Sequence, residues 1–149
     1  MSDAAMRTMV NDIPVPAFDT TPCTRAPRLS DARVAIVTTA ALVREGDEGW
    51  KAGDEGFRLL PSDARDVRVG HFSPNWDRSG LAADLNVAYP ADRLQELARR
   101  GTIASVASRH VTFHGVIEGT LSTIRYDSGP AAARVLRDDG VNVALLTPV

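Results

Sequence analysis

The chain has 149 residues and a formal net charge of −2, from 17 basic and 19 acidic side chains. This near-balance argues against binding to nucleic acids or anionic membranes, because both require a positively charged surface. Hydrophobic residues make up 44% and charged residues 24% of the chain, which is typical of globular rather than disordered proteins. No apolar run approaches the roughly 20 residues of a membrane-spanning helix, and no signal peptide is indicated. These features predict a cytoplasmic protein.

Several kinds of chemistry lack the residues they need. The single cysteine, Cys23, excludes an internal disulfide framework and a zinc site built from several cysteines. It is also a poor candidate for a nucleophile, because Arg25 is the only neighbour in the sequence that would favour its thiolate form. The glycine-rich phosphate-binding motifs and the Gly-x-Ser-x-Gly motif of serine hydrolases are absent. The sequence therefore assigns no cofactor.

The first 30 residues are rich in proline and poor in periodic apolar positions, which predicts an extended arm ahead of an α/β domain over residues 31–149. Residues 33–40 form a continuous β-branched run, as expected of a parallel strand that is buried on both faces. A loop is predicted over residues 44–56, followed by strands over residues 57–60 and 66–71.

Amphipathic helices are predicted over residues 92–100 and 130–139, and each is followed by a glycine suited to end it. Residues 103–107 fit either a strand or a loop, and residues 141–146 are predicted to form a last buried strand. Strands that alternate with helices indicate an α/β fold. We expect three layers around a mostly parallel, Rossmann-like sheet that is incomplete at its C-terminal end.

Ligands of such sheets bind at the carboxyl ends of the strands. In this chain those ends are residues 38–39, residues 71–77 and residues 147–148. We therefore expect polar side chains from these three segments to converge on one crevice.

The segment over residues 71–80, HFSPNWDRSG, is the richest in polar side chains. A purely structural interpretation is available, because Asn and Asp often satisfy the backbone groups of turns. The functional interpretation is a crevice wall in which Arg78 binds a carboxylate and Asn75 donates hydrogen bonds. His71 or Asp77 would then transfer protons.

A second polar cluster contains His110 and His114, which lie on one face whether the segment forms a helix or a strand. With His71 they suggest an alternative function, a metal-dependent hydrolase. The sequence lacks a His-Glu-x-x-His motif, and packed histidines explain the pair more simply.

Several of these segments together resemble a known family. The matching residues are VAIVTTAA over 34–41, HFSPNWDR over 71–78, DLNVAYP over 84–90, DRLQEL over 92–97, Arg109-His110, and DGVNVALLTPV over 139–149. In this order and spacing they are similar to selenoprotein B of the glycine/betaine/sarcosine/D-proline reductase family. The Ser-Pro-Asn-aromatic-Asp-Arg segment is the most specific part of the resemblance.

The resemblance implies reductive cleavage of a C–N bond in a small amino-acid-like substrate, with electrons drawn from thiols. A selenocysteine or cysteine would attack the substrate carbon, since a selenol is largely ionised at neutral pH. The implied substrate-binding residues are Ser73, Asn75, Arg78 and Thr147, and the implied proton-transfer residues are His71, Asp77 and His110. The implied partner is another reductase subunit or a second copy of the chain.

The sequence departs from the family pattern at Val149, because the nucleophile is expected directly after Thr-Pro-Val. One hypothesis is that a UGA codon for selenocysteine was read as a stop. The alternative is a short, non-catalytic module of the same fold that binds or assembles with a partner. The apolar run over residues 141–146 favours the first hypothesis, because it requires a covering layer.

Overall fold

The computed structural model describes residues 2–12, 17–20, 24–73, 78–115 and 120–149. Asn75, Asp77 and Cys23 lie outside the described residues. None of the described helices is long and apolar enough to cross a membrane.

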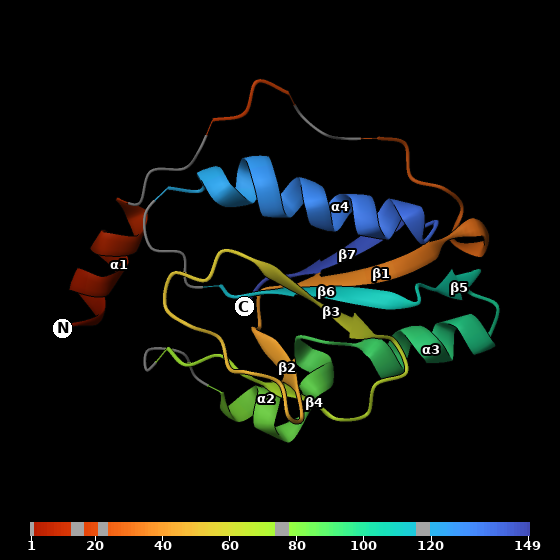
Figure 1. The fold of residues 1–149 in the computed structure, drawn as a ribbon, viewed down its shortest axis with the longest axis horizontal. Coiled ribbons are helices and arrows are strands. Elements are labelled where there is room, and N and C mark those ends of the chain that lie inside the picture. The colour runs from red at the N-terminus through yellow and green to blue at the C-terminus, as the bar shows by residue number, and fades with distance from the viewer. Residues whose placement is uncertain (1, 13–16, 21–23, 74–77, 116–119) are drawn as a thin grey trace.

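A five-stranded sheet forms the centre of the fold, and β1 (Arg33–Thr38) is its central strand (Figure 1). On one side, β1 pairs in parallel with β7 (Val143–Thr147) over five residues. On its other side it pairs in parallel with β5 (Ser105–Val106) and then with β6 (Arg109–Phe113). The outer strand β3 (Phe57–Pro61) runs antiparallel to β6, so the sheet is mixed rather than wholly parallel.

Helices cover both faces of this sheet (Figure 1). On one face, α4 (Gly129–Asp138) buries Ala132 and Leu136 against Ala35 and Val111. On the other, α3 (Ala91–Arg99) buries Leu94 in a cluster with alternate β1 residues. Successive β1 residues point to opposite faces of the sheet, and a helix covers each face. The side chains on both faces are therefore apolar, which explains the unbroken hydrophobic run. The α/β class is confirmed, whereas the antiparallel β3 departs from a regular Rossmann-like sheet.

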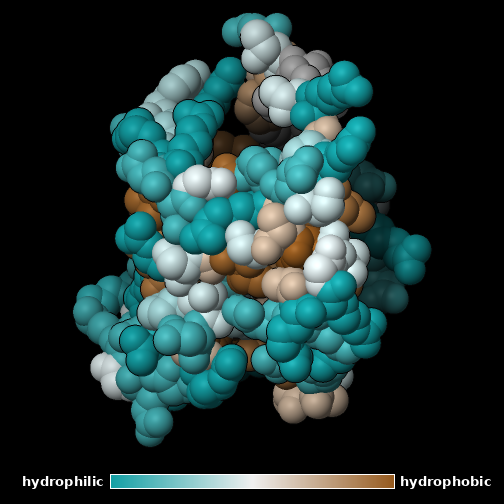
Figure 2. Space-filling view, turned by 90° about the vertical axis from the view of Figure 1, so that its right-hand side faces the viewer, coloured by the Kyte–Doolittle hydropathy of each residue, from teal (hydrophilic) through white to brown (hydrophobic). Residues whose placement is uncertain are grey.

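A smaller unit lies on the α3 side of the sheet. It consists of the antiparallel pair β2 (Leu42–Arg44) and β4 (Val67–Val69), together with the short helix α2 (Ser79–Ala83). A 3₁₀ turn, η2 (Leu85–Val87), leads from it into α3. Figure 2 looks along the molecule from the β5 and α3 end and shows apolar residues gathered at mid-height between polar ones.

The turn from β1 into this unit has an unusual backbone. Ala41 is fully buried and has a φ of 49°, in the left-handed region that disfavours residues other than glycine. Its carbonyl accepts a hydrogen bond from the Gly70 N–H at 2.9 Å. A Cβ at Gly70 would lie 2.8 Å from that oxygen, so this close approach requires glycine. The contact brings the end of β4, and hence His71, to the end of β1.

Two predictions about elements are corrected. The N-terminal arm is not extended throughout, because α1 (Asp3–Asn11) is helical, and η1 (Leu29–Asp31) is a 3₁₀ turn. The last strand, β7, is not buried, because it forms an edge of the sheet and Leu146 is 68% exposed. A π-helical segment, η3 (Ile124–Ser128), precedes α4.

Candidate functional site

The carboxyl ends of β1, β6 and β7 meet at one edge of the sheet. Two of the strand ends predicted to converge, residues 38–39 and 147–148, lie at this edge. The third, which begins at His71, follows β4 of the separate antiparallel pair and not a strand of this sheet. The side chain of Thr39, just after β1, binds the end of the chain beyond β7. Its Oγ1 accepts a hydrogen bond from the Val149 N–H at 2.9 Å and lies 3.2 Å from the Val149 carbonyl oxygen, to which it donates. Gly115, just after β6, completes the group. A Cβ there would lie 3.1 Å from the Thr39 carbonyl and 3.3 Å from the Val149 carbonyl.

Thr147 was predicted to orient this strand end, and it lies at the same edge. Its carbonyl accepts hydrogen bonds from the Thr38 hydroxyl at 3.1 Å and from the Thr39 N–H at 3.4 Å. Its own hydroxyl donates to the Ala88 carbonyl at 2.7 Å, which ties the segment before α3 to the sheet. The hydroxyl is therefore engaged within the fold.

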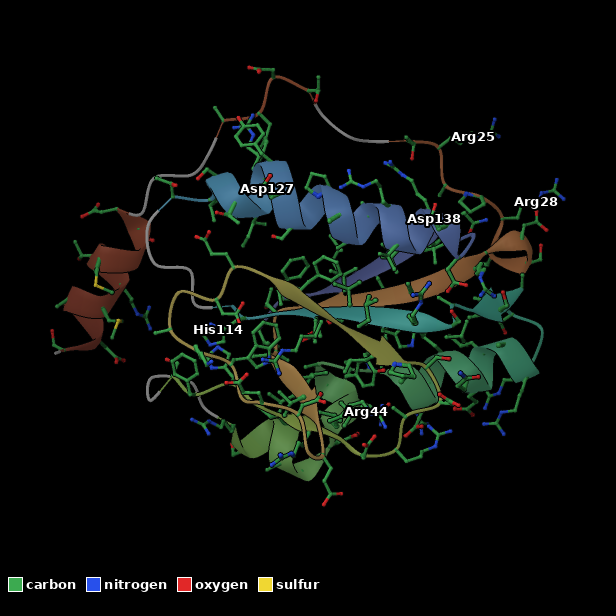
Figure 3. All side chains as sticks on the ribbon, viewed as in Figure 1. Arg25, Arg28, Arg44, His114, Asp127 and Asp138 are labelled. Carbon is green, nitrogen blue, oxygen red and sulfur yellow. The ribbon has the colours of Figure 1, made fainter. Side chains whose placement is uncertain are left out.

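Aromatic rings gather around His114 at this edge, where Figure 3 shows its side chain beside the end of the sheet. Phe72 stacks on the His114 ring at 4.6 Å between centroids, and the His71 ring lies at 4.9 Å. Trp50 stacks on the same ring at 6.0 Å, and its indole N–H donates to the Leu42 carbonyl. His71 and His114 are both almost fully buried. The result is an apolar wall that carries two imidazoles.

The His71 imidazole is held in one orientation, because its Nδ1 accepts a hydrogen bond from the Ser73 N–H at 3.2 Å. Burial lowers its pKa from the ordinary value, and the nearby His114 and Arg78 lower it further. The structure therefore favours neutral His71 at neutral pH. Arg78 lies close by at the start of α2, where its guanidinium donates to the Ser73 carbonyl at 3.4 Å. His71, Ser73 and Arg78 are thus neighbours, and their roles in substrate binding and proton transfer stay predictions.

His110 lies apart from this group, farther back along β6. It is fully buried, and the ring of Tyr89 packs edge-on against it. Between β5 and β6 the parallel ladder to β1 is interrupted, and the His110 Nδ1 accepts the hydrogen bond of the Ile36 N–H at 3.1 Å there. Burial lowers the His110 pKa to about 4, so the ring is neutral at physiological pH.

The metal-dependent hydrolase alternative is not supported by this arrangement. Among the described residues, no three His, Cys, Asp or Glu side chains come together as metal ligands. His71 and His114 are neighbours, but His110 binds the backbone of β1 instead.

Three residues of this edge were not identified from the sequence: Trp50, Phe72 and Gly115. Trp50 lies in a Gly/Asp/Glu-rich segment that indicates only a loop. Phe72 has a signal, since it is an aromatic residue between two predicted site residues. For Gly115, the only signal is a glycine directly after a predicted strand.

Comparison with curated proteins finds two similar reductase subunits. The chain is 35% identical over 130 residues to D-proline reductase subunit gamma of Acetoanaerobium sticklandii, which covers 85% of this chain and 52% of that protein. It is 27% identical over 144 residues to sarcosine reductase complex component B subunit beta of Peptoclostridium acidaminophilum, which covers 91% of this chain and 32% of that protein. The chain is therefore a homologue of reductase subunits.

The resemblance to the selenoprotein B type of reductase component is thereby confirmed. The chain spans about half the length of the first of these relatives and about a third of the second. No protein-family model matches the sequence. No solved structure matches it either.

Proposed function

We propose that the chain is a component of an amino-acid reductase that cleaves a C–N bond in a small amino-acid-like substrate with thiol-derived electrons. The observation that carries this proposal is the 35% identity to D-proline reductase subunit gamma over most of the chain. Net cleavage consumes two electrons and two protons, and it replaces the C–N bond by a C–H and an N–H bond. Two thiols supply both the electrons and the protons and become a disulfide.

We place the substrate at the edge formed by Thr39, Gly115 and Val149. The family resemblance places the nucleophilic selenium or sulfur directly after the Thr-Pro-Val sequence, and Val149 lies in this edge. The nucleophile would therefore act beside the His71 and His114 rings. The stacked rings of Phe72 and His114 would form one side of the site.

Arg78 is the proposed binding group for the substrate carboxylate. Among the described residues its guanidinium makes one long hydrogen bond, to the Ser73 carbonyl, and a guanidinium has further donors for a bidentate contact with a carboxylate. Ser73 and Asn75 precede it in the sequence and would add hydrogen bonds. Thr147 would hold the strand end in place through its bond to Ala88.

Proton transfer to the leaving nitrogen is assigned to His71, with Asp77 as the second candidate in the same segment. His71 lies close enough to Arg78 for its pKa to be lowered by that charge, and its ring lies beside His114. His110 was an equal candidate from sequence. Its contact with the Ile36 N–H argues for a structural role, so it is the least favoured of the three.

The test is a reductase assay on the assembled complex that contains this subunit, with dithiothreitol as the electron donor. Glycine, sarcosine, betaine and D-proline are offered in turn, and amine release or ring opening is measured. We expect one of them to be reduced, and Arg78→Ala to raise its KM at least tenfold. Arg93→Ala is the matched control, because Arg93 is exposed and pairs with Glu96 on α3. Failure to reduce any of the four would overturn the proposal.

A further inference from the structure

A small pocket lies on the α3 side of the sheet. Its walls come from the loop before β4, the η2 turn and the first turn of α3, and its volume is about 110 Å³. Four polar or charged residues line it together with aliphatic side chains: Arg65, Asn86, Tyr89 and Asp92. The lining shares no residue with the proposed substrate site.

Two oxygen atoms of this lining are buried and have no hydrogen-bond partner among the described residues, Asn86 Oδ1 and Tyr89 OH. The orientation of the Asn86 amide is fixed, because its Nδ2 donates to the Asp84 carboxylate at 2.9 Å. Its Oδ1 therefore faces away from Asp84 and can only accept a hydrogen bond. Tyr89 is 5% exposed, and burial raises the pKa of its hydroxyl, which therefore stays protonated and can donate.

Unpaired buried oxygens of this kind are rare, because each loses its hydrogen bonds to water on folding and gains nothing in return. A bound molecule with one donor and one acceptor would satisfy both Asn86 and Tyr89. The pocket that both residues line is where such a molecule can reach them.

Two opposite charges lie at the same pocket. The Arg65 Nη1 and the Asp92 Oδ1 are 3.8 Å apart, and both side chains are largely exposed. Both charges also act on the Tyr89 hydroxyl, since Arg65 lowers and Asp92 raises its pKa. An exposed ion pair of this length contributes little to stability, so each partner can turn to a ligand at little cost.

We propose that this pocket binds a small zwitterion, an α-amino acid of the size of glycine. Its carboxylate would accept hydrogen bonds from the Tyr89 hydroxyl and the Arg65 guanidinium. Its ammonium group would donate to Asn86 Oδ1 and to the Asp92 carboxylate. A molecule that carries only one of the two charges would leave Arg65 or Asp92 without its partner.

The size of the pocket favours the same class of ligand. A cavity of about 150 Å³ in another protein holds benzene, so 110 Å³ suits a smaller molecule, and glycine is smaller than benzene. The proposal does not depend on the proposed function, because neither Arg78 nor Val149 takes part in it.

The first test is a titration of the full 149-residue chain with glycine, followed by NMR at the backbone amides of Asn86 and Tyr89. Acetate and methylamine are the comparison probes, because each carries one of the two charges of glycine. We expect saturable shifts with glycine, and an affinity at least tenfold higher than for either probe. Equal affinities for the three compounds would overturn the proposal. So would the absence of any shift with glycine, which would mean that water alone occupies the pocket.

Two variants test the residues. Tyr89→Phe removes the hydroxyl but retains the ring that packs against His110, and Arg65→Gln removes the exposed charge. Each should weaken glycine binding at least tenfold. The matched controls are Tyr126→Phe and Arg68→Gln, because both of these side chains are exposed and neither lines the pocket. Unchanged glycine affinity in either test variant would contradict the proposal.

A last variant separates this pocket from the proposed substrate site. Arg78→Ala should leave the glycine affinity measured at Asn86 and Tyr89 unchanged, because Arg78 does not line the pocket. A loss of these shifts in Arg78→Ala would assign the glycine signal to the other site and would remove the basis for a second one. A failed reductase assay, by contrast, would leave this result untouched.

Discussion

The Thr39 hydroxyl binds both backbone groups of Val149, although 110 residues separate the two in the sequence. It therefore continues the β1–β7 pairing by one side chain beyond the last paired residues, Thr38 and Thr147. This contact fixes the direction in which the chain leaves the sheet, next to His114 and Gly115.

Replacing Thr39 by valine should release this end of the chain. Valine keeps the shape of threonine but can form neither hydrogen bond, and we expect a loss of about 1 kcal/mol in unfolding free energy. Hydrogen exchange at the Val149 amide should become much faster. Thr39→Ser is the control, because it retains the hydroxyl and should keep the amide protected. Equal protection in the valine variant would show that the side chain does not hold Val149.

Acid should destabilise the fold through His110. Its pKa of about 4 in the folded state lies below the unfolded value of 6.5, so the unfolded chain binds the proton more readily. The stability is fully present above pH 6.5 and is lost as the pH falls toward 4, by roughly 3 kcal/mol in total. Urea unfolding at several pH values measures this loss.

The variant His110→Gln separates this effect from other titrations. Glutamine does not titrate, and its carbonyl can still accept the Ile36 hydrogen bond. We expect a flatter dependence of stability on pH between 6.5 and 4. His71→Gln is the comparison, because the His71 pKa is also lowered and its removal should flatten the curve less. An unchanged slope in the His110 variant would contradict the assignment.

Asp139 should also make the stability of the fold depend on pH, in a lower pH range than His110 does. Desolvation raises its pKa, but hydrogen bonds from Arg33 at 2.6 Å and from Ser108 outweigh it and lower the pKa to about 2. The lowered folded pKa means that its stabilisation is present above pH 3.8 and is lost as the pH falls toward 2. Asp139→Asn should cost about 2 kcal/mol at pH 7.

Asp138→Asn provides a matched control for this prediction. Asp138 is the neighbouring residue at the end of α4, and it is exposed (Figure 3). Its replacement should change the unfolding free energy by less than about 0.5 kcal/mol. A similar loss of unfolding free energy in both variants would mean that the end of helix α4, and not the ion pair with Arg33, is the source of the stabilisation.

Substituting Gly70 by alanine should destabilise the small unit that carries His71. The new Cβ would lie 2.8 Å from both the Ala41 carbonyl oxygen and Val43 Cγ1, which is too close without a backbone shift. We expect a loss of about 1–3 kcal/mol in thermal or urea unfolding. Gly80→Ala in α2 is the control, since nothing lies within 4 Å of that position and alanine favours helices. An unchanged unfolding free energy in Gly70→Ala would show that the backbone of this unit shifts at no cost to make room for the Cβ.

The sequence identified the elements whose patterns are unambiguous. The run at β1 and the amphipathic helices α3 and α4 lie within one or two residues of their predicted positions. The apolar run at β7 predicts a buried strand, and this prediction is wrong. An apolar composition indicates that a strand can be buried, but it does not indicate whether the strand lies at the centre or at the edge of the sheet. Helix α1 was missed because prolines dominate the N-terminal segment.

The site was predictable in outline, since the ends of β1 and β7 and the residue His71 do converge. The sequence could not show which of His110 and His114 belongs to the site, because both are expected on the same face of β6. The structure distinguishes them, since His110 binds the Ile36 N–H in the gap between β5 and β6. Ala41 has a backbone conformation that no local sequence pattern indicates.

The central position of β1 has a consequence for how the polypeptide acquires its structure. Its longest ladder joins it to β7, 109 residues downstream, so the sheet cannot close until β7 has left the ribosome. Until then, one apolar flank of β1 stays open to misassembly. Synthesis of this protein should therefore make it a client of chaperones that shelter nascent strands.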